Sequence, residues 1–206
     1  MSSLRILAFS DFHAYLQQVK YFKLVKQCLI QHKPDVLIFC GDFVVNSSLR
    51  QIEFLFKKLE FDNIFYVWGN SDGYEPNFQL KNSNNLHLNP IKLNDFLFVG
   101  IGGDEIDCKH QIENLEKKVS NSKEKIILVS HVPPKGACDL CNDGRNVGVV
   151  ELREFINLIQ PKLHIFGHIH EQARSESIIN LTTCINVGAE GMLITIKNGK
   201  IEIFFI

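Results

Sequence analysis

Apolar positions fall into two alternating patterns along the first third of the chain. Short and almost continuous apolar runs are typical of buried strands, and three of them lie at 5–9, 36–40 and 63–68. Apolar residues at helical spacing separate these runs, in the segments 19–31 and 49–59. The order strand, helix, strand, helix, strand favours parallel strands with helices packed against the faces of the sheet.

The pattern is less regular after residue 68. Further strand-like runs lie at 86–88, 96–100, 125–130 and 163–166, and helical spacing returns at 110–120 and 149–159. The segment 133–147 contains two prolines and two glycines and is predicted to be a loop. Strand-like runs close the chain at 184–187, 192–196 and 201–206, and Asn198-Gly199 between the last two is a strong hairpin signal. We therefore predict a mixed α/β fold, parallel early in the chain and antiparallel late.

The composition is that of an ordinary soluble protein. The chain has 206 residues, 45% of them hydrophobic and 22% charged, which suits one domain spanning 1–206 with a sizeable core. The formal net charge of −1 does not favour nucleic acid or an anionic membrane as partner. No apolar run approaches a membrane span and no signal-peptide pattern is present, so we expect a cytoplasmic location. In that setting the six cysteines are expected to be free thiols.

Metal-competent side chains follow five successive predicted strands. They are Asp11 and His13 after the first strand, Asp42 after the second, Asn70 after the third, His131 after the strand at 125–130, and His168 and His170 after the strand at 163–166. Ligands of open α/β sheets bind at the carboxyl ends of the strands. We therefore expect these seven side chains to line one site.

The donor chemistry of this set points to two cations. Three oxygen donors and four imidazoles exceed the four ligands of one tetrahedral ion, so two ions sharing a bridging ligand are expected. The mixture suits Mn, Fe, Zn, Co or Ni; it is too rich in nitrogen for Mg or Ca, and it has no thiolate for copper(I). A single histidine after a strand is more often a hydrogen-bonded core residue, so the hypothesis depends on the whole series.

The series D-x-H, G-D, G-N, H after a strand and G-H-x-H resembles the calcineurin-like metallophosphoesterase superfamily. The resemblance extends from Asp11 to His170. The segments 131–136, 146–148 and 167–171 are similar to the small, single-domain predicted phosphoesterases of archaea and bacteria within it. The resemblance implies a four-layer αββα sandwich of two mixed sheets, the metallo-dependent phosphatase-like fold.

The resemblance also implies a role for each ligand. Asp11, His13 and His170 would hold the first cation, Asn70, His131 and His168 the second, and Asp42 would bridge both. A bridging water or hydroxide would attack phosphorus. The implied activity is that of a divalent-metal-dependent phosphodiesterase or small-molecule phosphatase, with Mn as the first expectation for the metal and a phosphate ester as substrate. Asp42, Asn70 and His131 would thus serve catalysis as well as metal binding.

The sequence departs from the family pattern at one catalytic position. Many members carry G-N-H-D or G-N-H-E, and the histidine is thought to protonate the leaving oxygen, but this chain has Gly69-Asn70-Ser71-Asp72. Ser71 cannot act as an acid at neutral pH. Asp72 could replace it only if its carboxyl group were protonated, and a good leaving group needs no acid. The Asp and Arg that follow G-D in the large protein phosphatases are also missing, which disfavours that activity.

The predicted loop at 133–147 offers candidate substrate contacts. The planar guanidinium of Arg145 suits a phosphate or carboxylate, and Asn146 follows it, although a solvated loop charge is an equally good interpretation. Cys138 and Cys141 form a CxxC motif, but no second pair has the spacing of a zinc site.

Two rival functions remain at this level. A nuclease is the first, although repair nucleases of this fold usually add a capping domain and a basic surface. The second is a non-catalytic, metal-binding interaction module of the same fold, as in the retromer subunit. The apolar end 203–206 could form an edge strand that pairs with a second copy, which would make a homo-oligomer, or it could be buried in the second sheet.

Overall fold

Two six-stranded sheets stack face to face in the computed structural model, which describes residues 3–13, 18–43, 49–72 and 80–206. The first sheet has the order β12 (Lys200–Phe205), β11 (Met192–Lys197), β1 (Leu4–Phe9), β2 (Val36–Phe39), β3 (Ile64–Tyr66) and β4 (Asn84–Asn85). The second has the order β5 (Ile91–Leu93), β6 (Phe96–Ile101), β7 (Lys125–Ser130), β8 (Leu163–Phe166), β10 (Thr182–Asn186) and β9 (Ser175–Ile179).

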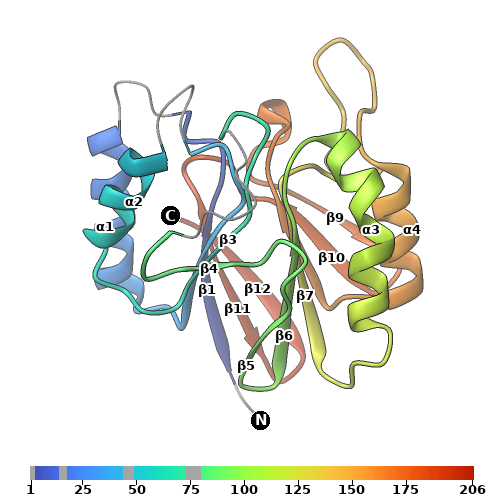
Figure 1. Cartoon of the computed structure of the whole chain (residues 1–206), viewed down its shortest axis with the longest axis horizontal. Helices are drawn as coiled ribbons and strands as arrows, with labels where there is room; N and C mark the ends of the chain where they lie inside the picture. Colours follow the sequence, from blue (N-terminus) through green and yellow to red (C-terminus); the bar gives the residue numbers. More distant parts are fainter. Residues whose placement is uncertain (1–2, 14–17, 44–48, 73–79) are drawn as a thin grey trace.

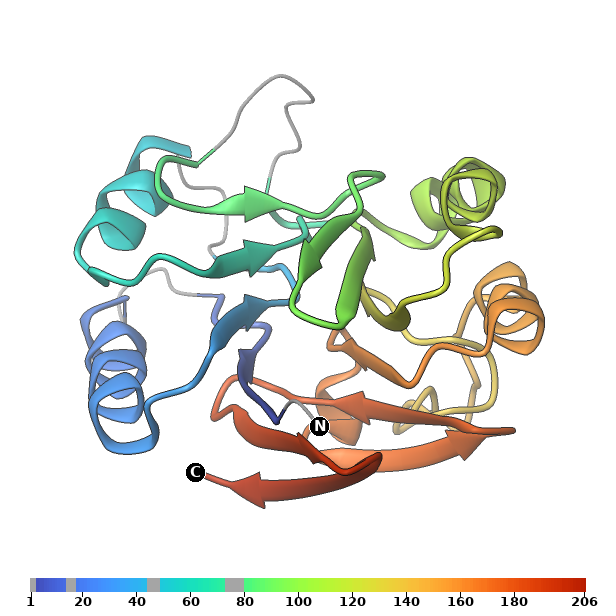
Figure 2. The same ribbon diagram turned by 90° about the horizontal axis from the view of Figure 1, so that it is seen from below.

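Helices cover the outer face of each sheet. On the first sheet these are α1 (Gln18–His32) and α2 (Leu49–Lys57); on the second they are α3 (Glu105–Val119) and α4 (Val150–Ile159) (Figures 1 and 2). A short 3-10 helix, η1 (His170–Gln172), follows β8. The arrangement confirms the expected four-layer αββα sandwich.

The strand directions agree with the sequence pattern. β1, β2 and β3 are parallel to one another, as are β6, β7 and β8, whereas β11 pairs antiparallel with both β1 and β12. Asn198 and Gly199 both have positive φ, 51° and 79°, which a two-residue hairpin turn requires. The predicted hairpin between β11 and β12 is therefore confirmed.

The early apolar runs are continuous because both faces of their strands are buried. In β1, Ile6 and Ala8 point into the apolar layer between the two sheets, whereas Leu7 and Phe9 pack toward the helices of the first sheet. A strand covered on both sides needs no polar alternation. A third apolar layer joins the second sheet to α3 and α4.

Several elements differ from the sequence-based expectation, and these include the short strands β4 and β5, which were not predicted. α3 begins at Glu105 rather than at residue 110, because Asp104 caps it and forms a reciprocal capping box with Asp107. The run at 86–88 is not a strand; within it His87 makes only an isolated bridge to Gly100. β9 was not predicted, because its exposed and half-buried residues include Ser175, Glu176 and Ser177 and therefore give no apolar signal.

The cysteines, the apolar end of the chain and the helices each bear on an expectation from the sequence. All six cysteines are free. β12 lies at the edge of the first sheet, with Phe204 and Phe205 exposed, so the apolar end is an edge strand and is not buried in the second sheet. Within the described part of the chain, no helix combines the length and the apolar character needed to cross a membrane.

Candidate metal centre

The carboxyl ends of strands from both sheets meet at one edge of the sandwich, the upper edge in Figure 1. All seven predicted ligands lie in the segments that leave β1, β2, β3, β7 and β8 there. Ligand atoms come together in two overlapping groups, Asp11 with His13 and His170, and Asp11 with Asp42 and His131. Within each group these atoms lie no more than 4.8 Å apart. Five of the seven side chains that were expected to line one site therefore lie together in these two groups.

One half of the centre is formed by Asp11, His13 and His170; we call it the outer half. The Nε2 atoms of the two histidines are 3.1 Å apart. Asp11 Oδ1 lies 3.6 Å from His170 Nε2 and 3.9 Å from His13 Nε2. These three side chains enclose a space with nitrogen and carboxylate donors directed into it.

The other half is formed by Asn70, His131 and His168; we call it the inner half. His131 Nε2 lies 2.9 Å from Asn70 Oδ1 and 3.1 Å from His168 Nδ1. His131 is fully buried, and the His168 side chain is 20% exposed. The Nε2 atom of His131 thus has an amide oxygen and a second imidazole nitrogen as close neighbours.

Asp42 lies between the two halves. Its Oδ2 is 3.3 Å from His13 Nε2 in the outer half and 3.6 Å from His131 Nε2 in the inner half. Oδ2 also accepts a hydrogen bond from the Ser71 hydroxyl at 3.0 Å, and Oδ1 accepts one from the Ser71 amide at 2.8 Å. One oxygen atom is therefore within reach of both groups of ligands.

The tautomer of His131 is set by its surroundings. Its Nδ1 is 2.7 Å from the carbonyl oxygen of Cys40, which can only accept, so Nδ1 carries the hydrogen and donates. The Nε2 lone pair then faces the centre. Burial lowers the pKa of His131 and is opposed by the charges of Asp42 and Asp11, so the ring is held in the neutral form that metal ligands require.

Asp11 provides a direct test of whether the centre fits a cation. Its Oδ2 accepts a hydrogen bond from the His168 amide at 2.9 Å. Its Oδ1 is buried and has no hydrogen-bond partner among the described residues, although it faces the His170 ring at 3.6 Å. Burial alone would raise the pKa of Asp11, but His170, His131 and the nearby hydrogen bonds lower it overall. A buried anionic oxygen without a donor, beside convergent imidazole nitrogens, fits a divalent cation.

The backbone around the centre adopts conformations that residues other than glycine rarely adopt. Four of the candidate ligands have positive φ: Asp11 at 58°, His13 at 39°, Asp42 at 53° and His168 at 71°. Ten other non-glycine residues with positive φ lie elsewhere in the described part of the chain, so the centre is indicated by its side chains and not by this backbone feature alone.

The glycines before three of the ligands are required by close approach of the backbone. A Cβ atom on Gly69 would lie 2.1 Å from Asp42 Oδ1, and one on Gly167 would lie 2.2 Å from Asp11 Oδ2. Gly41, with φ of 90°, would meet the amide nitrogen of Gly69 at 2.3 Å. The G-D, G-N and G-H pairs of the sequence therefore bring the strand ends together.

Asp72 lies next to Asp42, and its carboxylate binds backbone amides. Its carboxylate accepts hydrogen bonds from the amides of Asp42 at 2.7 Å, Phe43 at 2.8 Å and Gly69 at 2.9 Å. A carboxylate that must serve three N–H donors is poorly placed to donate a proton. This geometry favours a role for Asp72 in orienting the loop over a role as general acid.

The loop at 133–147 borders the outer half. The contacts described for its two candidate substrate residues, Arg145 and Asn146, are not to the candidate metal ligands. Arg145 is exposed and pairs with Asp143 at 2.7 Å, while the carbonyl oxygen of Asn146 accepts from Lys135 Nζ. The loop reaches η1, where Glu171 accepts a hydrogen bond from the Asn142 amide at 3.2 Å.

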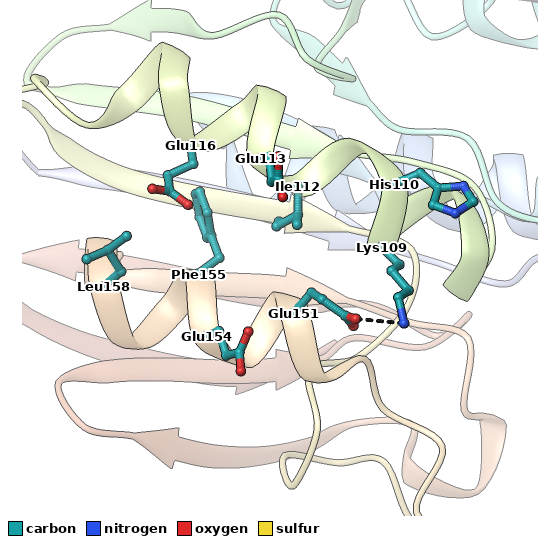
Figure 3. Close-up of a pocket in the computed structure, with 9 residues that line it drawn as sticks. All are labelled: Lys109, His110, Ile112, Glu113, Glu116, Glu151, Glu154, Phe155 and Leu158. Carbon is teal, nitrogen blue, oxygen red and sulfur yellow. Dashed lines mark ion pairs between the residues drawn. The ribbon is translucent and has the colours of Figure 1, made fainter.

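A surface hollow of about 500 Å³ lies between α3 and α4 and is separate from this cluster (Figure 3). Its lining residues are Lys109, His110, Ile112, Glu113, Glu116, Glu151, Glu154, Phe155 and Leu158. They share no member with the seven candidate ligands. An ion pair of 3.0 Å between Lys109 and Glu151 joins the two helices beside it. The chemistry predicted from the sequence therefore lies at the strand ends and not in this hollow.

One contact at the centre was not predicted from the sequence. The Glu105 carboxylate, at the start of α3, lies 3.0 Å from His168 Nε2. The missed signal was the capping sequence from Asp104 to Asp107, which places the start of a helix there.

Comparison with known proteins gives the family and the fold. A model of the calcineurin-like phosphoesterase family matches residues 4–172. Human metallophosphoesterase domain-containing protein 1 is 47% identical over 47 residues, a match that spans 22% of this chain and only 14% of the human protein.

Two solved structures are similar over nearly the whole chain. Protein TT1561 of Thermus thermophilus has a TM-score of 0.73 at 14% identity, with 99% of each chain covered. A dimetal phosphatase from Danio rerio has a TM-score of 0.65 at 10% identity, with 93% of this chain and 92% of that chain covered. At such identities the likeness shows a shared fold.

Proposed function

The chain belongs to the calcineurin-like phosphoesterase family, and we propose that it hydrolyses small phosphate esters with two divalent cations. The family match and the shared fold support a metal-dependent hydrolase. The proposal for this chain depends mainly on one observation, the position of Asp42 Oδ2 within 3.3 Å of His13 Nε2 and 3.6 Å of His131 Nε2. A single carboxylate oxygen between two clusters of ligands is the arrangement that a shared pair of ions needs.

We assign one cation to each half of the centre. Asp11, His13 and His170 would hold one, Asn70, His131 and His168 the other, and Asp42 would contact both. When bound, the two cations would stabilise charge on the phosphate oxygens and acidify a water molecule for attack on phosphorus. Manganese remains our first expectation among the ions that a mixture of nitrogen and oxygen donors without thiolate suits, which also include Fe, Zn, Co and Ni.

The residues around Asp42 keep its carboxylate directed at both halves. Ser71 donates to both carboxylate oxygens, through its amide and its hydroxyl. Asp72 holds the Asp42 amide, so the backbone that carries the bridge is tied to the turn that carries Asn70. These contacts position the ligands and move no proton.

The same contacts explain why we expect a preference for good leaving groups. The hydroxyl at position 71 donates to Asp42 Oδ2 at 3.0 Å, and Asp72 is engaged by three backbone amides. Neither group is placed to protonate a departing oxygen. General acid catalysis is typically worth about 10²–10⁴-fold, and its loss is felt most when the leaving oxygen is basic. We keep Arg145 and Asn146 as proposed substrate contacts, because their loop borders the outer half.

Metal content and hydrolysis together test the proposal. The purified chain is reconstituted with Mn²⁺, freed of excess metal and assayed on an aryl phosphodiester, an aryl phosphomonoester and nucleotides. We expect about two ions per chain and metal-dependent hydrolysis. Asp42→Asn should retain less metal and lose at least about 1,000-fold in rate, since the bridge is worth several kcal/mol in the transition state.

The matched control is Asp62→Asn. Asp62 precedes β3 and therefore lies at the opposite end of the strand from Asn70, so this variant should behave as wild type. A wild-type chain that retains no metal, or an Asp42→Asn variant with the metal content and rate of wild type, would refute the two-cation assignment.

A further inference from the structure

Glu105, the first residue of α3, contacts the inner half of the centre although it is not one of the seven ligands. Its Oε1 is 3.0 Å from Nε2 of His168. The other ring nitrogen of His168, Nδ1, is 3.1 Å from Nε2 of His131. The His168 ring therefore stands between the Glu105 carboxylate and the point where the ligands of the inner half converge.

This contact selects the ring nitrogen of His168 that can bind a cation. A carboxylate oxygen accepts hydrogen bonds, so Nε2 of the imidazole carries the hydrogen and donates it. A neutral imidazole protonated at Nε2 has its lone pair on Nδ1, which is the atom that faces His131. Glu105 thus acts on His168 as the Cys40 carbonyl acts on His131.

The turn that leads into α3, and with it Glu105, is held by the segments that follow β3 and β4. The Gly103 amide donates to the Trp68 carbonyl at 2.8 Å, and the Gly102 amide donates to His87 Nδ1 at 3.0 Å. A Cβ atom on Gly102 would lie 2.7 Å from the Trp68 amide nitrogen. Asp104 then caps the helix by accepting from two of its first amides. The carboxylate beside His168 is therefore presented by a defined turn.

We propose that Glu105 is a positioning residue for the cation of the inner half. It orients the His168 ring, fixes its tautomer and increases the electron density available at Nδ1. The inference depends on the proposed two-cation function. Partners of this kind typically change metal affinity or activity by about 10–100-fold when they are removed. Glu105 itself remains 44% exposed in its side chain, so its replacement should leave the fold intact.

Metal titration of variants tests the role of Glu105. Metal-free protein is titrated with Mn²⁺ by calorimetry, and the affinity for each ion is determined. Glu105→Ala should weaken one of the two ions by about 10–100-fold and leave the other unchanged. Glu105→Gln should lose less, because its amide oxygen can still accept from His168. The control Glu113→Ala, an exposed glutamate on the same helix, should keep both affinities. Wild-type affinity for both ions in Glu105→Ala would overturn the inference.

A second measurement requires no metal. Imidazole nitrogen shifts in ¹⁵N-histidine-labelled, metal-free protein report the tautomer of His168. We expect the Nε2–H tautomer in wild type and a mixture of tautomers in Glu105→Ala. If wild type binds two ions and the variant changes neither tautomer nor affinity, the proposed function stands and the role of Glu105 is wrong. If the tautomer changes as expected but wild type binds fewer than two ions, the proposed function fails while the contact with Glu105 stands.

Discussion

The two halves of the centre are built from similar ligands but differ in how the protein holds them. In the inner half, His131 is fully buried with its ring tied to the Cys40 carbonyl, and His168 is tied to Glu105. In the outer half, the side chains of His13 and His170 are 28% and 60% exposed. Their described contacts are to each other and to the carboxylates that would share their cation.

This difference indicates two ways of making a ligand cluster. Hydrogen bonds from the protein fix ring orientation and tautomer in the inner half. In the outer half, orientation depends on the Asp11 carboxylate, which raises the pKa of His170 through hydrogen bonding and charge. The inner half should therefore rearrange little when its cation is lost. Substitution of an inner-half residue should lower the stability of the fold more than substitution of an outer-half residue.

The sharpest contrast is between His131→Ala and His170→Ala. Each removes one ligand, so both should lose at least about 100-fold in phosphoesterase rate. Only His131→Ala removes a fully buried side chain together with the 2.7 Å hydrogen bond to the Cys40 carbonyl, which keeps only the longer 3.3 Å bond from the Ser10 hydroxyl. This variant should lower the free energy of unfolding by about 1–3 kcal/mol. His170→Ala should stay within about 0.5 kcal/mol of wild type. Urea unfolding in the presence of a chelator measures both; equal destabilisation would remove the contrast.

The stability of the fold should depend on pH through His164, which lies in β8 and contacts Ser130, the residue before His131 of the inner half. The Ser130 hydroxyl donates to the Val132 carbonyl, so His164 Nε2 donates to Ser130. The other ring nitrogen of His164, Nδ1, is buried and has no hydrogen-bond partner in the described part of the chain. Burial lowers the pKa of His164 from 6.5 to about 3.

The sign of the effect follows from proton uptake. Below about pH 6.5 the unfolded chain binds a proton at His164 that the folded chain refuses until about pH 3. Stability is therefore lost as the pH falls through this window, on the order of 3 kcal/mol at about pH 4. His164→Leu should show a smaller loss of stability between pH 7 and pH 4 than wild type, and the exposed control His110→Leu should not. Parallel curves for His164→Leu and wild type would contradict the assignment.

Stepwise removal of metal should separate the halves. In the reconstituted protein mixed with excess chelator, we expect one ion to leave at least about tenfold faster than the other, because its ligands lack the hydrogen-bonded support. His13→Ala should lack the fast phase and His168→Ala the slow phase. Loss of the slow phase in His13→Ala would reverse our assignment of the better-supported half.

The smallest effect is expected from loss of one hydrogen bond to the bridging carboxylate of Asp42. Ser71→Ala removes one hydrogen bond to Asp42 Oδ2 but keeps the amide bond to Oδ1. We expect a loss of roughly fivefold in rate, similar for aryl esters with good and with poor leaving groups. A loss confined to poor leaving groups would instead mean that the hydroxyl takes part in proton transfer.

The sequence was informative wherever a polar residue interrupts an apolar run at a strand end. Asp42 and His131 are such residues. Parallel topology brings the strand ends of each sheet to one edge, whereas the meeting of the two edges depends on how the two sheets stack.

What the sequence did not reveal depends on contacts between distant segments. Glu105 meets His168 across 63 residues of sequence, and no local pattern specifies that pairing. The anchoring role of Asp72 follows from three backbone amides that only the folded turn brings together. β9 is held by its backbone pairing with β10, which polar side chains do not predict.

The ligands come from both layers of the sandwich, and this has a consequence for the molecule as a whole. Asp42 and Asn70 leave strands of the first sheet, whereas His131 and His168 leave strands of the second. A cation bound between them would be a cross-link that holds the two sheets together at their shared edge. Because binding would favour only the folded arrangement, the thermal stability of the chain would depend on the supply of metal: removal of metal should lower the stability of the whole sandwich as well as the activity of its centre.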